Sequence, residues 1–149
     1  VLKLPGSEIE IKIKGFADRI DNWNKSVRIL DYKSGAVDAK ALKKIPFENL
    51  FADNKHEKAI QLLSYAWLLK DKYPHAELQS GIIALRNINE PYVFINSASG
   101  NTISDSDVEE FEQELTRFFE LLFNKEIPFK QTEEKKNCQY CPYVNICLK

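Results

Sequence analysis

The chain contains no methionine, not even at position 1. We therefore read Val1 as a position inside a longer protein and expect the chain to be a C-terminal fragment. No apolar run approaches the roughly 20 residues that a membrane-spanning helix needs, and no signal peptide opens the sequence. These absences predict a protein without a membrane segment.

The sequence also lacks an excess of charge of either sign, with 21 Lys and Arg against 22 Asp and Glu. A polyanionic partner would have to be met by local basic patches or bound metal, because the net field offers no attraction. Apolar and aromatic residues are plentiful: 44% of the chain is hydrophobic, with nine Phe, six Tyr and two Trp. In 149 residues this composition excludes disorder and predicts one globular domain.

Cysteine is absent upstream of Cys138, and the other two thiols are Cys141 and Cys147. An odd number of thiols without a secretory signal argues against a disulfide framework and for a reducing, cytoplasmic setting. The close spacing would let several thiolates face one soft metal or cluster. Three ligands do not complete such a site, so a fourth would lie upstream of Val1. A zinc-stabilised interaction module is an alternative interpretation of the same three thiols.

Period-two alternation predicts β-structure in the N-terminal half. Residues 8–14 place three isoleucines on one face and charges on the other, which predicts a strand that continues to about Asp21. Residues 22–25 have the composition of a turn. Residues 27–33 then form the returning strand of a hairpin.

After the hairpin, helical and extended segments alternate. Residues 36–54 are expected to form a loop with a short helical turn. Residues 55–70 lack Gly and Pro and are rich in Leu and Ala, which predicts a helix, and residues 78–85 and 92–95 are two further strands. This order predicts a mixed α/β fold, in which a central sheet with an antiparallel hairpin is flanked by helices.

A second helix is expected to begin at a capping box formed by Ser106 and Glu109. Apolar residues follow at helical spacing and predict a buried stripe. The stripe consists of Val108, Phe111, Leu115, Phe118, Phe119 and Leu122.

Two carboxylates and a lysine are expected to share one face of the hairpin. Asp31 and Lys33 are two residues apart on one strand, so their side chains point the same way. Any register in which paired residue numbers have an odd sum puts Asp18 on that face too, and a sum of 47 or 49 fits the predicted turn. Two such carboxylates repel unless a cation lies between them, and oxygen ligands suit Mg²⁺ or Mn²⁺.

With Lys33 able to stabilise charge on a phosphate, the set predicts metal-assisted hydrolysis of a phosphodiester. Spacing alone favours a surface salt-bridge cluster of Asp18, Asp31 and Lys33, because hairpins often carry mixed charges. The predicted helix adds Gln61, Ser64 and Tyr65, an uncharged polar stripe. Such a stripe suggests a semi-buried polar neighbour such as the edge of a catalytic cleft, but taken alone it is better explained by Gln61 and Tyr65 capping the rim of the core.

Lysines are the remaining candidates for contact with a nucleic acid. They are Lys40, Lys43, Lys44, Lys55 and Lys58. They could form a basic rim for a strand, or they could be an ordinary solvated face.

Four motifs occur in a fixed order: Gly15-Phe16-Ala17-Asp18, Asp31-Tyr32-Lys33, Gln61-x3-Tyr65 and Cys138-x2-Cys141-x5-Cys147. Taken together they resemble the PD-(D/E)XK nuclease superfamily, specifically its RecB/AddB-type iron–sulfur branch. The resemblance implies a restriction-endonuclease-like core over nearly the whole chain. Family members carry a further helix and a first cluster cysteine upstream, so a fragment that lacks both could be inactive and cluster-free.

The resemblance also implies roles for individual residues. Asp18 and Asp31 would be metal ligands together with the backbone carbonyl of Tyr32, and Lys33 would be the catalytic lysine. Gln61 and Tyr65 would shape the site. A supporting pair would be Arg19 and Asp21, and the ligands of a [4Fe–4S] cluster in the full-length protein would be Cys138, Cys141 and Cys147.

The activity implied is Mg²⁺-dependent hydrolysis of DNA, at single strands or duplex ends, in repair or recombination. The partner implied is a helicase domain or subunit. The alternative from another class is an inactive nuclease fold that binds DNA or serves as a scaffold. Such a domain would usually lose Asp18, Asp31 or Lys33, and this chain has all three.

Overall fold

A computed structural model describes residues 1–43, 45, 47–48, 50–52, 54–74, 76–97, 100–130, 132–133, 135–139 and 141–147. Lys44, one of the expected rim lysines, lies outside these residues. Within the described residues, the helices are too short or too polar to cross a bilayer.

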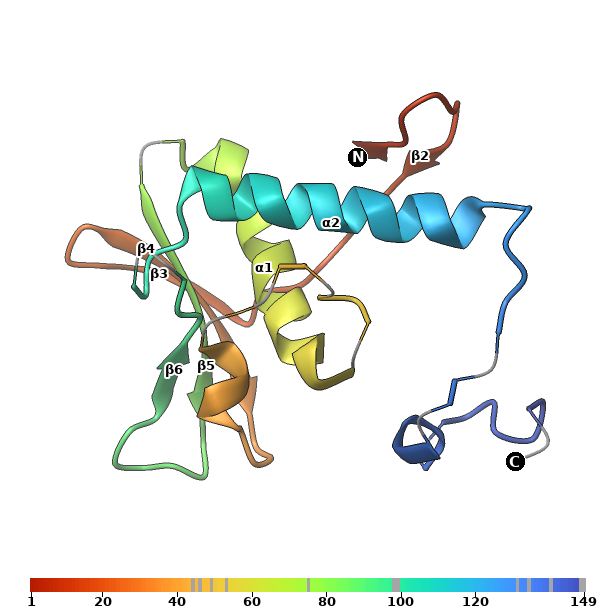
Figure 1. Ribbon diagram of the computed structural model, residues 1–149. Coiled ribbons are helices and arrows are strands. Elements are labelled where there is room, and N and C mark those ends of the chain that lie inside the picture. The colour runs from red at the N-terminus through yellow and green to blue at the C-terminus, as the bar shows by residue number, and fades with distance from the viewer. Residues whose placement is uncertain are drawn as a thin grey trace.

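The fold is built on a four-stranded mixed sheet, in the order β3-β4-β5-β6 (Figure 1). The strands are β3 (Arg19–Trp23), β4 (Ser26–Lys33), β5 (Glu77–Ala84) and β6 (Tyr92–Phe94). β4 pairs antiparallel with β3 and parallel with β5, and β5 pairs antiparallel with β6. The predicted mixed sheet with an antiparallel hairpin is confirmed.

The hairpin has the register that the turn predicts. Trp23 pairs with Ser26 and Arg19 pairs with Leu30, so paired residue numbers sum to 49. The loop is therefore two residues long, and Asn24 takes a positive φ of 54°, a conformation that asparagine tolerates better than most residues. This turn fixes which side chains of β3 and β4 share a face.

The expected continuous strand up to about Asp21 is wrong, because the chain divides it between two sheets. β2 (Glu10–Ile11) pairs antiparallel with β1 (Leu2–Lys3) in a separate small sheet. Residues 12–18 have no regular structure and lead to β3. The alternating isoleucines still have a physical role, since Ile11 and Ile13 pack against the core.

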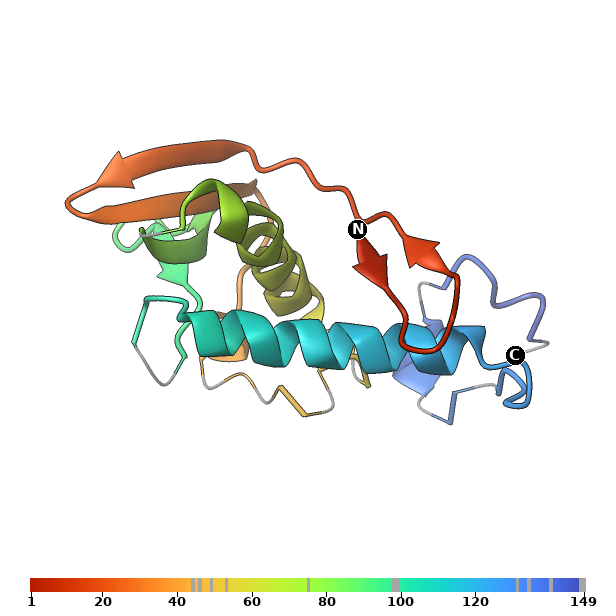
Figure 2. The same ribbon diagram turned by 90° about the horizontal axis from the view of Figure 1, so that it is seen from above.

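The layers of the fold stack from the sheet to α1 (Glu57–Leu69) and then to α2 (Asp105–Phe123). α1 packs against β4 and β5 on one side and against α2 on the other (Figure 2). At the α1–α2 contact, Trp67 Nε1 and Lys70 Nζ donate to Glu112 Oε2 at 2.7 and 2.8 Å. The Lys70 ammonium holds the pKa of Glu112 below its usual value, and the Trp67 bond adds to the effect. α1 is thus anchored on both of its sides.

Four short 3-10 helices complete the described structure: Ala39–Leu42, Asn54–His56, Lys70–Lys72 and Lys135–Cys138. The first is the helical turn expected in the loop after the hairpin, and Asp38 Oδ1 caps it by accepting from Lys40 N at 2.9 Å. The next two flank α1, so the regular helix is slightly shorter than the predicted 55–70.

α2 begins two residues earlier than expected, because its cap is Ser104 and not Ser106. Ser104 Oγ accepts from Asp107 N at 3.2 Å, and Asp107 Oδ2 accepts from Ser104 N at 2.8 Å, which together make a capping box. Ile103 donates its backbone N–H to Leu78 O, so the chain is held extended up to the cap. The predicted box of Ser106 and Glu109 lies inside the helix.

The apolar stripe of α2 is buried only in its first half. Val108, Phe111 and Leu115 lie in the core, whereas Phe118 and Leu122 are 38% and 40% exposed. Figure 2 shows the reason: the second half of α2 runs past the end of α1.

On the sheet face turned away from α1, Asp21 of β3 binds Arg28 of β4. Arg28 Nε and Nη2 donate to the two carboxylate oxygens at 2.7 and 2.9 Å. The Arg28 guanidinium lies 4.9 Å from the ring centre of Trp23 and 5.4 Å from that of Tyr92. Arg28, with help from Arg19, holds the pKa of Asp21 below its usual value of 3.8.

Replacing Asp21 with asparagine should lower the free energy of unfolding by about 1–2 kcal/mol at neutral pH, because a paired, charge-assisted interaction is lost. A depressed pKa stabilises the fold above the usual value, and this contribution is lost as the pH falls through the lower, folded-state value. The difference between wild type and Asp21→Asn should therefore shrink below about pH 4. Urea unfolding at several pH values measures it.

The exposed helix residue Glu120 provides the control. Glu120→Gln should change the free energy of unfolding by less than about 0.5 kcal/mol at every pH of the series. A difference for Asp21→Asn that stayed constant across the acid range would show that the charge of Asp21 does not stabilise the fold.

Candidate active site

β4 places Asp31 and Lys33 on the sheet face that α1 covers. Asp31 is 4% exposed, and its Oδ2 lies 2.8 Å from Lys33 Nζ. That contact is an ion pair without hydrogen-bond geometry, so the buried Oδ2 makes no hydrogen bond. A buried carboxylate without full hydrogen bonding is costly. The fold therefore holds Asp31 with acceptor capacity to spare.

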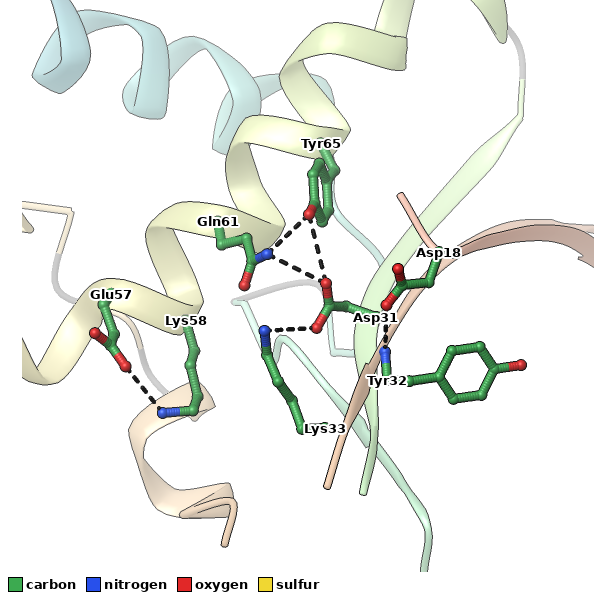
Figure 3. Close-up of polar contacts among 8 residues, drawn as sticks. All are labelled: Asp18, Asp31, Tyr32, Lys33, Glu57, Lys58, Gln61 and Tyr65. Atoms are coloured by element: carbon green, nitrogen blue, oxygen red, sulfur yellow. Dashed lines mark hydrogen bonds and ion pairs between the residues drawn. The ribbon is translucent and has the colours of Figure 1, made fainter. Parts of the chain in front are cut away.

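The other carboxylate oxygen of Asp31 is held from α1. Gln61 Nε2 donates to Oδ1 at 3.2 Å and the Tyr65 hydroxyl donates to it at 3.4 Å, as Figure 3 shows. Gln61 Nε2 also lies 2.8 Å from the Tyr65 hydroxyl. Gln61 and Tyr65 are four residues apart, so both project from one face of the helix. The predicted polar stripe thus does border a charged group.

Asp18 reaches the same strand from the irregular segment before β3. Its Oδ2 accepts from the backbone N–H of Tyr32 at 2.8 Å. If the hairpin register is extended by one residue, Asp18 falls directly opposite Asp31. Asp18 is exposed whereas Asp31 is buried, so one carboxylate faces solvent at the mouth of the site and the other forms its floor.

The Tyr65 hydroxyl experiences every charge of the site. Burial raises the pKa of Tyr65 above 10.0, and the carboxylates of Asp31 and Asp18 raise it further, whereas Gln61 and Lys33 lower it. The phenol is therefore protonated at neutral pH and acts as a donor.

Gly15 has a structural role in this site that the sequence did not indicate. A Cβ at position 15 would lie 3.0 Å from Tyr65 Cε1 and 3.2 Å from Cδ1. The absence of a side chain therefore lets the segment before Asp18 pack directly on the Tyr65 ring. Gly15 of the Gly-x-x-Asp motif and Tyr65 of the Gln-x3-Tyr motif are in contact.

Replacing Gly15 with alanine should push the Tyr65 ring away and weaken its bond to Asp31. We expect a loss of about 1–2 kcal/mol in the free energy of unfolding, as for other overpacked sites. Thermal unfolding measures it. Gly35→Ala is the matched control, because a Cβ there has nothing within 4 Å, and it should leave stability unchanged or slightly raised. Equal effects of the two substitutions would contradict the packing argument.

Three of the predicted site residues lie outside the site. Ser64 bonds back to Ile60 O at 2.7 Å and does not contact Asp31. Arg19 and Asp21 pair with each other at 2.7 Å on the opposite face of the sheet, so they support the hairpin.

The C-terminal thiols form a separate region of the chain. The part of the chain that the structure describes includes Cys138, Cys141 and Cys147, none of them in a disulfide, and no group of three or more His, Cys, Asp or Glu there could hold a metal ion. The structure therefore gives no support to an iron–sulfur cluster, which stays a prediction.

Two oxygen donors at the main site fit a hard divalent cation. The buried Oδ2 of Asp31, which makes no hydrogen bond, and the exposed carboxylate of Asp18 lie on the same face of the hairpin, and carboxylate oxygens are the ligands that Mg²⁺ and Mn²⁺ favour. The backbone carbonyl of Tyr32 is the third candidate ligand. With fewer than three charged ligands, any bound cation would keep several waters, as Mg²⁺ usually does.

Comparisons with known proteins bear on this geometry. Neither the curated proteins nor the solved structures gave a match. The family model described as the PD-(D/E)XK nuclease superfamily matches residues 2–148, and this range includes the Asp18, Asp31-x-Lys33 and Gln61-x3-Tyr65 motifs. The chain belongs to the PD-(D/E)XK nuclease superfamily.

Proposed function

We propose that the protein is a metal-dependent DNA nuclease of exonuclease type. The observation that carries the proposal is the environment of Asp31, a buried carboxylate held by Gln61 and Tyr65 and paired with Lys33. A surface salt-bridge cluster would not be held in this way from a separate helix. The arrangement gives one carboxylate a fixed orientation and leaves a cation beside it.

Each residue has a role that follows from its contacts. Gln61 and Tyr65 fix the orientation of Asp31 by donating to Oδ1, and Asp18 is fixed by the Tyr32 N–H. Lys33, with its side chain 31% exposed, can turn its ammonium towards a phosphate oxygen and stabilise the negative charge that develops there. A Mg²⁺ or Mn²⁺ ion held by Asp18, Asp31 and the Tyr32 carbonyl would activate water and neutralise phosphate charge.

The finer parts of the proposal rest on the motif resemblance. The RecB/AddB-type order of motifs supports DNA as substrate, at single strands or duplex ends, in repair or recombination. It also supports a cytoplasmic setting and a helicase domain or subunit as partner. A [4Fe–4S] cluster on Cys138, Cys141 and Cys147 belongs to the same proposal, for a longer protein that supplies the fourth ligand.

Cleavage of end-labelled DNA tests the activity. The purified chain is incubated with single-stranded and duplex oligonucleotides labelled at either end, with Mg²⁺, with Mn²⁺ or with EDTA. The proposal predicts cleavage that requires the cation and proceeds from an end. Binding without cleavage under every condition would instead favour the alternative, an inactive nuclease fold that serves as a DNA-binding or scaffold domain.

A further inference from the structure

One face of α1 extends the site in both directions along the helix. Lys58, Gln61, Tyr65 and Leu68 are separated by three or four residues, so they form a single stripe. From Lys58 to Leu68 this stripe spans about 15 Å of helix axis. That length corresponds to about four stacked nucleotides at roughly 3.4 Å each. The middle of the stripe holds Asp31.

A lysine occupies the N-terminal end of the stripe. Figure 3 shows Lys58 leaving α1 on the same side as Gln61, with its ammonium turned to Glu57. Its ammonium lies 3.1 Å from Glu57 Oε1, and the two side chains are 31% and 70% exposed. Adjacent residues do not face each other on a helix, and exposed pairs contribute little. Lys58 can therefore exchange Glu57 for another anion at low cost.

An apolar pocket lies at the other end of the stripe. It has a volume of about 230 Å³ and is formed between Gly15–Ala17 on one side and Tyr65, Leu68 and Leu69 of α1 on the other. Tyr65 belongs both to this pocket and to the contacts of Asp31. The pocket therefore borders the candidate active site at Tyr65.

Phe16 stands at the edge of this pocket with 91% of its surface exposed. It lies two residues before Asp18 and is one of the most exposed large apolar residues of the described chain. An exposed aromatic ring beside a carboxylate site can stack on a nucleobase whatever its sequence. Positive charge at one end and an aromatic ring at the other match the phosphates and bases of a single strand.

We propose that α1 is the track of the substrate strand: Lys58 binds a backbone phosphate on one side of Asp31, and a base stacks on Phe16 over the apolar pocket on the other side. This inference rests on the proposed function and adds the path of the strand. Glu57 occupies the phosphate position at Lys58 until the strand binds.

The two contacts have different signatures in salt. Binding of a fluorescein-labelled oligothymidylate of about a dozen nucleotides is measured by anisotropy across a KCl series, with Ca²⁺ in place of Mg²⁺. Lys58→Ala removes one phosphate contact, so the slope of log K against log salt should fall in magnitude by about 0.7. Lys58→Arg should restore the slope. Phe16→Ala should weaken binding about tenfold with no change in slope, and Phe16→Trp should restore affinity.

Matched controls come from the same chain. Lys125→Ala removes an exposed lysine after α2, and Phe129→Ala removes a phenylalanine that is 86% exposed. Neither should change affinity or slope. Glu57→Gln should tighten oligonucleotide binding severalfold when Lys58 is present, because Glu57 then no longer competes with the phosphate for the ammonium. In the Lys58→Ala background the same substitution should have no effect.

Cleavage by the wild type, assayed in parallel with Mg²⁺, separates the two proposals. If the wild type cleaves while Lys58→Ala keeps its slope and Phe16→Ala keeps its affinity, the track is wrong and the nuclease stands. If only one of the two variants shows its signature, the track as proposed is wrong, since it requires both ends. If the wild type neither binds nor cleaves, the proposed function fails and the track fails with it.

Discussion

Replacing Lys33 with methionine should reduce DNA hydrolysis by about 10²–10³-fold, the usual effect of removing one donor that faces developing charge. Lys33 Nζ is 2.8 Å from Asp31 Oδ2, where it can contact both the carboxylate and a phosphate bound beside it. Methionine keeps most of the aliphatic stem, so packing is preserved. Single-turnover cleavage gives the rate, and near-ultraviolet circular dichroism checks the fold.

Lys125→Met is the control for this substitution, since Lys125 is exposed and follows α2, far in sequence from Asp18, Asp31 and Lys33, and it should cleave at the wild-type rate. Lys33→Arg retains the charge but not the compact ammonium, so an intermediate rate is expected. Undiminished cleavage by Lys33→Met would remove Lys33 from the chemistry.

Replacing Asp31 with asparagine should abolish measurable hydrolysis and cation binding while the fold survives. The amide oxygen can still accept from Gln61 and Tyr65, so the contacts to α1 are kept. The negative charge that balances Lys33 is lost. The amide nitrogen would take the place of Oδ2, which in the wild type lies 2.8 Å from the Lys33 ammonium. Metal-supported hydrolysis should drop by at least about 10³-fold, since both cation binding and charge balance are lost.

Asp31→Ala separates the structural role from the chemical one. It removes the acceptor of the Tyr65 hydroxyl and one of the two acceptors of Gln61 Nε2, which should cost about 1–3 kcal/mol in the free energy of unfolding. Urea unfolding should show a smaller loss of unfolding free energy for Asp31→Asn than for Asp31→Ala, although both variants lose activity. A variant Asp31→Asn that cleaves as the wild type does would show that Asp31 is only structural.

Much of the fold followed from local patterns. The turn at Asn24 fixed the hairpin register, and the parity of that register placed Asp18 and Asp31 on one face. The same parity separates Arg19 and Asp21 from Asp18, because alternate residues of a strand point to opposite faces. The resemblance implied that Arg19 and Asp21 support the site, but the alternation of side chains along the strand places them on the opposite face from Asp18.

The features that could not be predicted from the sequence depend on contacts between residues that are far apart in the chain. The alternation in residues 8–14 does not reveal that β2 pairs with β1, because period two is the same in either sheet. The α2 cap lies at Ser104 because Ile103 is bound to Leu78, a contact distant in sequence. Likewise, Gly15 packs on Tyr65. Each residue belongs to a motif that can be recognised in the sequence, but neither motif shows that it contacts the other.

The central claim is that Asp18 and Asp31 form one cation site. Calorimetric titration of the chain with Mn²⁺, beside Asp31→Asn and Asp18→Asn, tests it without any substrate. The account predicts saturable binding of Mn²⁺ by the wild type that both substitutions abolish. Equal binding by the wild type and Asp31→Asn, or no binding by the wild type, would contradict it.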